Sequence, residues 1–303
     1  MPADLTASER PVLVRDGAGL GLPFSRGLMA TSILATGADT DVAYAIAASI
    51  QRALAEDGAR SIGADALAAL AGNTIATIGG PTMAARYRTW RALRREGRPL
   101  VIVLGGAPGV GKSTLSTRLA VRLGITRVVT TDTIREVLRT VIPSTVLPEL
   151  HVSTYEAISE RADDPDAYLR QARVVGGALL AVGERLMSER RSVILEGVHL
   201  LPGEILPTLA AHPSQPVAVE LLLTLDDVEL HRAHLAARAT GEPTRGGARA
   251  LAQFARIRRL HEVLVDRARA RGIETLDVGE PRRLSERLLE LIFGQAAPTV
   301  ARP

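Results

Sequence analysis

The eight residues Gly106-Ala-Pro-Gly-Val-Gly-Lys-Ser113 have the composition and spacing of a loop that binds phosphate. Glycines allow successive backbone N–H groups to turn toward an anion, and the N-terminus of a following helix adds a favourable dipole. The lysine then reaches the β- and γ-phosphates of a nucleotide, and the hydroxyl reaches a magnesium ion. The residues expected to bind ATP and Mg²⁺ are Gly106, Ala107, Pro108, Gly109, Val110, Gly111, Lys112, Ser113 and Thr114.

The surroundings of the loop favour this interpretation over an ordinary glycine-rich turn. An apolar run at residues 100–104 precedes the loop and a helical pattern at residues 114–123 follows it, which is the strand–loop–helix order that the motif requires. Lys112 is also the single lysine in a chain whose other basic residues are all arginine. A compact ammonium fits between two phosphates, where a planar guanidinium fits poorly.

Asp132 follows the next strand-like segment, residues 127–130. The carboxyl ends of strands face the ligand crevice of an open α/β sheet, so Asp132 is expected beside the transferred phosphoryl group. There it could orient an acceptor hydroxyl or take its proton. Thr131 or Asp132 as the N-cap of the next helix is the alternative. Arg135, one turn further, could bind an acceptor phosphate or carboxylate, or could be a solvated helix residue.

Glu196 ends a third apolar segment, residues 192–195, and is therefore expected beside the phosphate loop. A carboxylate in that place would support the Mg²⁺ shell, so Ser113 and Glu196 are the residues expected on the metal side. His199 follows closely, and the position suits either a structural histidine or one that faces the substrate. No partner with metal-ligand spacing accompanies it in the sequence.

Residues 226–258 have the features of an arginine-bearing lid. The loop Gly241-Glu-Pro-Thr-Arg245 separates two segments with helical patterns, and both segments carry arginines. Such a segment can close over a site, exclude water and bring cations to the charge that develops during phosphoryl transfer. Arg238 and Arg258, and then Arg245, are the arginines expected to act there, while most others are expected on the surface.

The elements that must position these residues fall into two parts. Along residues 99–303, apolar runs alternate with helical patterns, with strands expected at 100–104, 127–130, 192–195, 217–223 and 273–277. This predicts an α/β core of three layers, in which helices cover both faces of a parallel sheet. Residues 1–98 instead predict a small domain with a hairpin at residues 12–24 and helices that begin near Ser25, Thr40 and Pro81.

The bulk composition excludes several classes of protein. The chain has no cysteine, which excludes disulfides and thiolate chemistry. Its formal net charge is only +4, and no basic block is interleaved with aromatic residues, so a nucleic-acid face is not expected. No run approaches the ~20 consecutive apolar residues of a membrane-spanning helix. The expected location is therefore the cytoplasm and the expected partner is a small anionic molecule, while self-association into a homo-oligomer stays open.

Several stretches together resemble the 2-phosphoglycerate kinase family over residues 12–277. They are Arg15-Asp-Gly17, Pro23-Phe-Ser-Arg-Gly-Leu28, Arg86-Tyr-x-x-Trp90, the phosphate loop, Thr131-Asp-x-Ile-Arg-Glu136, Ser153-Thr-Tyr155, Glu196-Gly-Val-His199 with Pro202-Gly203, and Ile257-Arg258. The resemblance implies an ATP-cone-like regulatory domain at residues 1–98, fused to a P-loop NTPase kinase domain at residues 99–303. It also implies transfer of phosphate from ATP to the 3-hydroxyl of 2-phosphoglycerate, which gives 2,3-diphosphoglycerate.

Taken with this resemblance, the residues define two expected sites. The expected catalytic residues are Lys112, Asp132, Arg135 and Arg238, and the expected substrate-binding residues are Asp132, Arg135, Tyr155, Glu196, Gly197, His199 and Arg258. If the N-terminal domain binds a nucleotide as an ATP cone does, its expected contacts are Arg15, Asp16 and Arg26. The chain departs from the family pattern in the lid, where His234-Leu235 replace an arginine and a phenylalanine.

Two other functions stay open at the level of sequence. The acceptor could be another phosphorylated polyol, such as an inositol phosphate, or a nucleotide-sugar. Alternatively, the chain could be a non-catalytic regulator that binds ATP in both domains and acts on a macromolecular partner. The combination of Thr131-Asp132 with Arg135 argues against a regulator, because a regulator needs no acceptor site.

Overall fold

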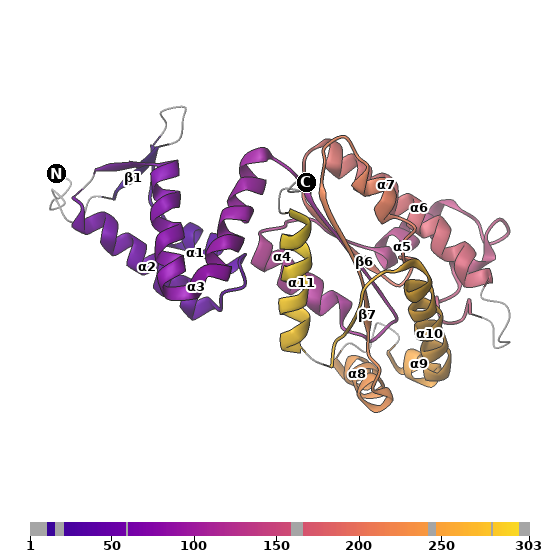
Figure 1. Ribbon diagram of the computed structural model, residues 1–303. Helices are drawn as coiled ribbons and strands as arrows, with labels where there is room; N and C mark the ends of the chain where they lie inside the picture. The colour runs from indigo at the N-terminus through magenta and orange to yellow at the C-terminus, as the bar shows by residue number, and fades with distance from the viewer. Residues whose placement is uncertain are drawn as a thin grey trace, which may run out of the picture. The chain divides into compact units, whose positions relative to one another are not determined.

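The computed structural model describes residues 11–15, 21–58, 60–158, 166–241, 247–279 and 281–296. These residues fall into two compact units (Figure 1). The described part of the first unit lies within Met1–Glu96, with Arg122–Gly124 and Ala296 added, and the second covers Gly97–Val121 and Ile125–Gln295. We refer to them as the N-terminal unit and the P-loop unit. In the described part of the chain, no helix is both long and apolar enough to cross a membrane.

The N-terminal unit combines a three-stranded sheet with three helices. The sheet has the order β2-β1-β3, in which β1 (Leu13–Arg15) pairs antiparallel with β2 (Gly21–Pro23) and parallel with β3 (Ser61–Gly63). The expected hairpin is thus present on either side of residues 16–20, which lie outside the described residues. The parallel third strand was not expected from the sequence.

The helices of this unit begin close to where the sequence predicts them. The backbone N–H of Leu28 donates to the hydroxyl of Ser25, which caps α1 (Arg26–Leu34) as expected. Helix α2 (Thr40–Glu56) has Asp39 rather than Thr40 at its N-cap. Its buried residues recur every three or four positions and pack into one core with α1 and α3: Ala43, Ile46, Ala47, Ile50 and Leu54.

Helix α3 (Ala64–Glu96) is two helices joined at a kink. Gly80 has φ 85°, a left-handed conformation that glycine adopts without steric cost, and Pro81 follows it. Because proline removes a backbone donor and fixes φ, it begins the second half of α3 well, as the sequence predicts. Tyr87, Trp90 and Leu93 of this second half are buried.

The P-loop unit is built on a parallel five-stranded sheet with the order β5-β6-β4-β7-β8. The strands are β4 (Leu100–Gly106), β5 (Val128–Thr130), β6 (Val193–Gly197), β7 (Val217–Thr224) and β8 (Thr275–Asp277). All five strands predicted from the sequence are confirmed. Every residue of β4 is buried, as expected for a central strand with helices on both faces.

Helices flank this sheet on both sides (Figure 1). The helices of the unit are α4 (Lys112–Leu123), α5 (Thr131–Val141), α6 (Asp166–Ser188), α7 (Leu206–Ala210), α8 (Val228–Gly241), α9 (Gly247–Ala252), α10 (Phe254–Arg271) and α11 (Pro281–Ala296), with a 3₁₀ turn, η1, at Pro148–His151. Apolar side chains of α6 and α7 pack against β4 and β6, and those of α6 and α10 pack against β7. The α/β core of three layers is therefore confirmed.

Candidate active site

The phosphate loop connects the central strand β4 directly to α4. Gly106, Gly109 and Gly111 have φ of 150°, 85° and 88°, conformations that favour glycine. A Cβ added at Gly106 would lie 2.8 Å from the carbonyl oxygen of Leu223, and one added at Gly109 would lie 2.8 Å from the side chain of Leu235. Glycine is therefore required at both positions, because β7 and α8 approach the loop closely.

Lys112, the first residue of α4, folds back over this loop. Its Nζ donates a hydrogen bond of 2.8 Å to the carbonyl oxygen of Ala107, so the ammonium lies across the cradle that the loop forms. Burial lowers the pKa of Lys112, and the nearby carboxylates of Glu196 and Asp132 raise it. The ammonium thus lies near two carboxylates from two neighbouring strand ends.

Glu196 at the end of β6 faces the beginning of α4. The Ser113 hydroxyl donates to Glu196 Oε1 at 2.9 Å, and Glu196 Oε2 is buried with no hydrogen-bond partner among the residues that the structure describes. A buried carboxylate oxygen without a donor is costly unless a cation or water satisfies it. Oxygen ligands from a hydroxyl and a carboxylate are those that Mg²⁺ prefers. The residues present therefore fit a magnesium ion.

Asp132 lies in the first turn of α5, directly after the strand that pairs with β6. Thr130 pairs with Glu196 in the parallel register of β5 and β6, which brings Asp132 to the same edge of the sheet as Glu196. The N-cap of α5 is Thr130, whose hydroxyl accepts from the backbone N–H of Thr133 at 3.1 Å. Neither Thr131 nor Asp132 is the cap, so that alternative is wrong, and the exposed Asp132 carboxylate is left for another role.

His199 is fully buried in a hydrogen-bonded chain and does not reach the site directly. Gln171 Nε2 donates to the carbonyls of Glu149 and Val152, so its Oε1 is the acceptor that faces His199 Nε2 at 3.1 Å. His199 Nε2 therefore carries the proton, and Nδ1 accepts from the Thr131 hydroxyl at 2.9 Å. Burial lowers the pKa of His199 to about 4, so the ring is neutral at pH 7.

The burial of His199 rules out the direct contact with substrate that the sequence predicted for it. His199 has no exposed surface, so it is a positioning residue that fixes Thr131 beside Asp132. The backbone of Gly197 passes just as close to Thr131, since a Cβ at Gly197 would overlap the Thr131 side chain. Thr131, also fully buried, is thus held between the end of β6 and His199.

The Arg135 guanidinium binds the loop after α5, so its donors are not directed at an acceptor phosphate or carboxylate. Its Nε donates to the Leu150 carbonyl at 3.1 Å, its Nη2 donates to the Val152 carbonyl at 2.8 Å, and its Nη1 pairs with Glu136. The guanidinium is therefore committed to the chain around η1. The loop leads to Tyr155, which is partly exposed and follows the buried Thr154.

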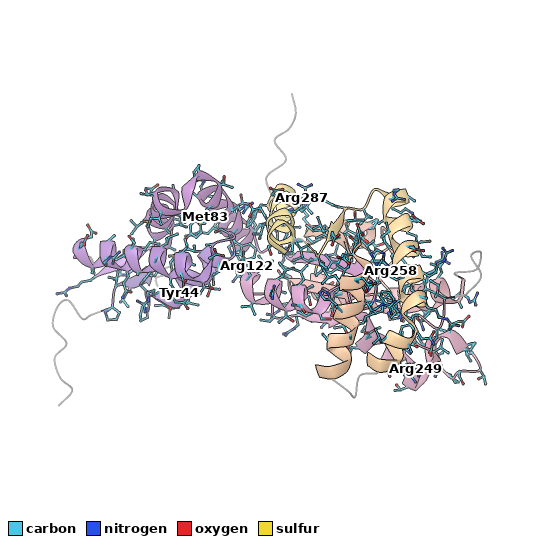
Figure 2. All side chains as sticks on the ribbon, turned by 90° about the horizontal axis from the view of Figure 1, so that it is seen from below. Tyr44, Met83, Arg122, Arg249, Arg258 and Arg287 are labelled. Carbon is cyan, nitrogen blue, oxygen red and sulfur yellow. The ribbon has the colours of Figure 1, made fainter. Side chains whose placement is uncertain are left out.

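Helix α8 contacts the phosphate loop through two histidines, which sequence reasoning did not assign to the site. His231 Nε2 donates to the Pro108 carbonyl at 2.8 Å, and His234 Nδ1 lies 3.3 Å from the Gly109 carbonyl. Arg258 donates to His231 Nδ1 at 3.2 Å and to the Leu225 carbonyl at 2.7 Å, which fixes the His231 tautomer. Arg258 therefore supports the loop through His231 and lies among densely packed side chains (Figure 2).

A cavity of about 800 Å³ opens from the phosphate loop toward α8 and α11. Besides loop residues, it is lined by Arg118, His234, Ala237, Arg238, Val278, Leu284 and Ser285. Arg238 lies near enough to Lys112 that its charge lowers the lysine pKa. The expected Arg238 is therefore brought to the loop, whereas Val278, which follows β8, and the two residues from α11 had no motif that could identify them.

The rest of the predicted lid is described only in part, since Arg245 lies outside the described residues. Helix α9 contributes Arg249, which forms an ion pair with Glu156 and lies at the edge of the unit (Figure 2). Ser153 also donates to Glu156, and these contacts lower the pKa of the Glu156 carboxyl. Helix α9 is thus linked to the loop that carries Tyr155.

Of the contacts expected in the N-terminal unit, Arg15 and Arg26 are described and Asp16 is not. Arg15 ends β1 and Arg26 begins α1, and both side chains are exposed.

Comparison with known proteins places this geometry in a family. A family model described as an AAA domain matches residues 101–264. The 2-phosphoglycerate kinase of Thermococcus kodakarensis is 36% identical over 264 residues, which cover 84% of this chain and 88% of the relative. The proteins of the same name from Methanopyrus kandleri and Methanocaldococcus jannaschii are 35% and 34% identical, over 84% and 89% of this chain and 79% and 87% of theirs. The chain belongs to the 2-phosphoglycerate kinase family.

Proposed function

We propose that this protein transfers the γ-phosphoryl group of ATP to the 3-hydroxyl of 2-phosphoglycerate and so forms 2,3-diphosphoglycerate. Membership of the family supports the substrate, since the relatives carry that name. The observation that carries the chemistry is the position of Lys112 near both Glu196 and Asp132 at the end of the phosphate loop. The Glu196 carboxylate suits a metal ion, and the Asp132 carboxylate suits the acceptor hydroxyl.

The phosphate loop binds and orients the nucleotide in this proposal. Its backbone N–H groups and the Lys112 ammonium hold the β- and γ-phosphates, as in other P-loop enzymes. The Ser113 hydroxyl and the Glu196 carboxylate would hold Mg²⁺, which when bound neutralises charge on the phosphates. Arg238, on the cavity wall, adds a cation where negative charge increases during transfer.

Asp132 acts on the acceptor. Its carboxylate orients the 3-hydroxyl and takes its proton as the oxygen forms a bond to the γ-phosphorus. The bond from that phosphorus to the bridging oxygen breaks, and ADP leaves with the electron pair. Tyr155 and the backbone at Gly197 border the acceptor. Arg135 and His199 fix the loop and Thr131 around it, and Arg258 acts through His231.

The test is the conversion of 2-phosphoglycerate by the Asp132→Asn variant. Loss of a general base or orienting carboxylate lowers kcat by about 10²- to 10⁴-fold, so ADP formation that depends on 2-phosphoglycerate should fall by at least about 10²-fold. Glu229→Gln is the matched control, because Glu229 is an exposed acid in the first turn of α8. Activity of the Asp132→Asn variant at the level of the control would exclude this role for Asp132.

The acceptor is tested separately with the unaltered protein. Each of a panel of phosphorylated acids, inositol phosphates and nucleotide-sugars is incubated with ATP and Mg²⁺, and the product is identified by the mass of one added phosphoryl group. Conversion of 2-phosphoglycerate supports the proposal. Conversion of a different acceptor alone would replace the substrate, and ATP binding without any conversion would favour the ATP-gated regulator.

A further inference from the structure

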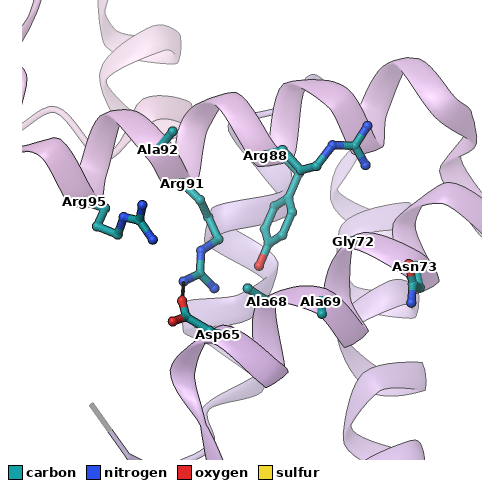
Figure 3. A pocket seen from close by; sticks show the side chains of 10 residues that line it. Asp65, Ala68, Ala69, Gly72, Asn73, Arg88, Arg91, Ala92 and Arg95 are labelled. Atoms are coloured by element: carbon teal, nitrogen blue, oxygen red, sulfur yellow. Dashed lines mark ion pairs between the residues drawn. The ribbon is translucent and has the colours of Figure 1, made fainter. Parts of the chain in front are cut away.

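The N-terminal unit contains a cleft that the proposed reaction does not use. It lies between the two halves of α3 and has a volume of about 350 Å³ (Figure 3). Its lining consists of Asp65, Ala68, Ala69, Gly72 and Asn73 from the first half, and Tyr87, Arg88, Arg91, Ala92 and Arg95 from the second. Arg15 and Arg26, the residues expected to contact a nucleotide in this unit, are not part of this lining.

Small residues on one wall keep the cleft open. Ala68, Ala69 and Gly72 recur at helical spacing and so share one face of the first half of α3. In the described part of the chain, a Cβ added at Gly72 would meet no heavy atom within 4 Å outside the nearby backbone of its own helix, although Gly72 itself has little exposed surface. The space beside Gly72 is therefore not filled by a neighbouring side chain.

The opposite wall is cationic. Arg88, Arg91 and Arg95 are spaced by three and four residues, which places them on one face of the second half of α3 (Figure 3). Arg91 is fixed, because its Nη1 donates to the Ala64 carbonyl at 3.1 Å and its Nη2 lies 3.7 Å from the Asp65 carboxylate. Within the described residues, neither Arg88 nor Arg95 has an acidic partner, and Asp65 is the single carboxylate of the lining, against three arginines. Of the three, Figure 3 shows Arg91 directed at Asp65.

The spacing of the arginines indicates the kind of ligand. Arg88 and Arg95 are seven residues apart, about 10 Å along the helix axis, with Arg91 between them. Guanidinium groups bind phosphate and carboxylate through paired hydrogen bonds. The single aromatic ring of the lining, Tyr87, is only 2% exposed and so offers no open face on which an adenine could stack.

We infer that this cleft is a second anion site, which binds a compact molecule with two anionic groups, such as a diphosphate or a phosphorylated acid. Arg88 and Arg95 bind one group each, and Arg91 stands between them. The inference does not depend on the proposed reaction, because every lining residue lies in the N-terminal unit.

The experiment uses the full chain with Lys112→Ala, which removes the ammonium from the phosphate loop, and pyrophosphate as the probe. Binding is followed by calorimetry at low salt and by the fluorescence of Trp90, the single tryptophan, which lies on α3. Pyrophosphate should bind this protein, and Arg88→Gln/Arg95→Gln should weaken the binding by at least 10-fold. The control is Arg52→Gln/Arg94→Gln, which removes the same charge from exposed residues outside the lining. This variant should change the affinity for pyrophosphate by less than 3-fold.

A second pair of variants tests the cleft itself rather than the charge. Gly72→Leu places a side chain in the open space and should abolish binding, whereas Gly72→Ala should keep most of it. Far-ultraviolet circular dichroism establishes that each variant is folded. The inference is overturned if the Lys112→Ala protein does not bind pyrophosphate, or if the two double variants bind equally. It is also overturned if ATP binds this protein more than 10-fold tighter than pyrophosphate and Arg88→Gln/Arg95→Gln abolishes that ATP binding, because the ligand of the cleft would then be a nucleotide.

Discussion

At the scale of single residues, the hydrogen bond between Ser113 and Glu196 gives a direct prediction about magnesium. Replacing Glu196 by Gln removes the negative charge and leaves the side chain nearly the same size. Residues around a bound metal typically contribute about 10- to 100-fold to its affinity. The Glu196→Gln variant should therefore need about 10- to 100-fold more Mg²⁺ for half-maximal activity, measured by titrating Mg²⁺ at saturating ATP.

Glu220 provides the control for this experiment. It lies within β7, burial raises its pKa, and its Oε1 accepts from the backbone N–H of Gly203, a bond that a glutamine can keep. Glu220→Gln should leave the Mg²⁺ requirement unchanged. If the Mg²⁺ concentration needed for half-maximal activity rises equally in both variants, the loss of any buried carboxylate explains the effect, and Glu196 is not a metal ligand.

His199 gives a second prediction at this scale. In His199→Asn, the amide oxygen can still accept from Thr131, but the shorter side chain no longer reaches Gln171. The loop around η1 then loses one of its supports, while the phosphate loop is untouched. Because small displacements of a reacting group are costly in rate, kcat should fall about 10-fold while the KM for ATP stays constant. A higher KM for ATP with constant kcat would argue against this positioning role.

The residues whose positions were predictable from the sequence are those that lie next to a recognisable strand or loop. Lys112 and Ser113 come after the buried strand β4 and a short loop, and Glu196 lies near the end of β6, so strand–loop order was enough to place them. His231 was not predictable, because its partner Pro108 lies 123 positions away and only the path of α8 brings the two together. His199 was ambiguous because its spacing does not reveal whether it is buried.

At the scale of elements, a change in α8 should alter the phosphate loop and so the binding of ATP. His231 of α8 donates to the Pro108 carbonyl and is itself held by Arg258, so this contact supports the shape of the phosphate loop. In His231→Asn the amide is too short to reach Pro108, whereas in His231→Gln it ends near the position of Nε2. We expect the KM for ATP to rise about 10-fold in the Asn variant, the equivalent of one buried hydrogen bond, and to recover in the Gln variant.

His212→Asn is the reference for this pair. His212 precedes β7, so it lies at the edge of the sheet opposite to the phosphate loop, and it bonds to Ser214. Its replacement should leave the KM for ATP as it is. If His231→Gln is as impaired as His231→Asn, the ring itself and its packing against Phe254, rather than the donated hydrogen bond, maintains the loop.

The elements themselves were largely predictable, and the exceptions have physical reasons. Four of the five strands of the P-loop unit contain apolar runs that composition located, and β8 (Thr275–Asp277), as short as β3, was located by its place in the alternation of strands with helical patterns. Strand β3 has only three residues, Ser61–Gly63, and includes one large apolar side chain, so it carries too little signal to be recognised. Likewise, the cap of α2 was misplaced by one residue, because Asp39 and Thr40 are both residues that cap helices well.

At the scale of the whole molecule, the histidines make the two units respond differently to acid. All six histidines lie between residues 151 and 261, and therefore in the P-loop unit, while the single tryptophan, Trp90, lies in the N-terminal unit. Burial lowers the pKa of His199 and of His261 from 6.5 to about 4. The unfolded chain thus binds more protons than the folded one between pH 6.5 and pH 4, so stability must increase with pH across this window.

The size of the effect follows from these pKa values. Between pH 7 and pH 5, each of these two buried histidines should destabilise the P-loop unit by about 1–2 kcal/mol. Urea denaturation followed by circular dichroism should show a transition that shifts to lower urea at pH 5. Trp90 fluorescence reports the N-terminal unit, which has no histidine, so the transition that it follows should shift less.

His261→Gln separates histidine titration from other acid effects. His261 Nε2 accepts a hydrogen bond of 3.2 Å from the backbone N–H of Leu225, and the side-chain oxygen of glutamine can take that position without binding a proton. The variant should lose about half of the shift that the two histidines cause between pH 7 and pH 5. A shift as large as in the unaltered protein would mean that carboxylates such as Glu156, whose lowered pKa acts in the same direction, cause the acid sensitivity instead.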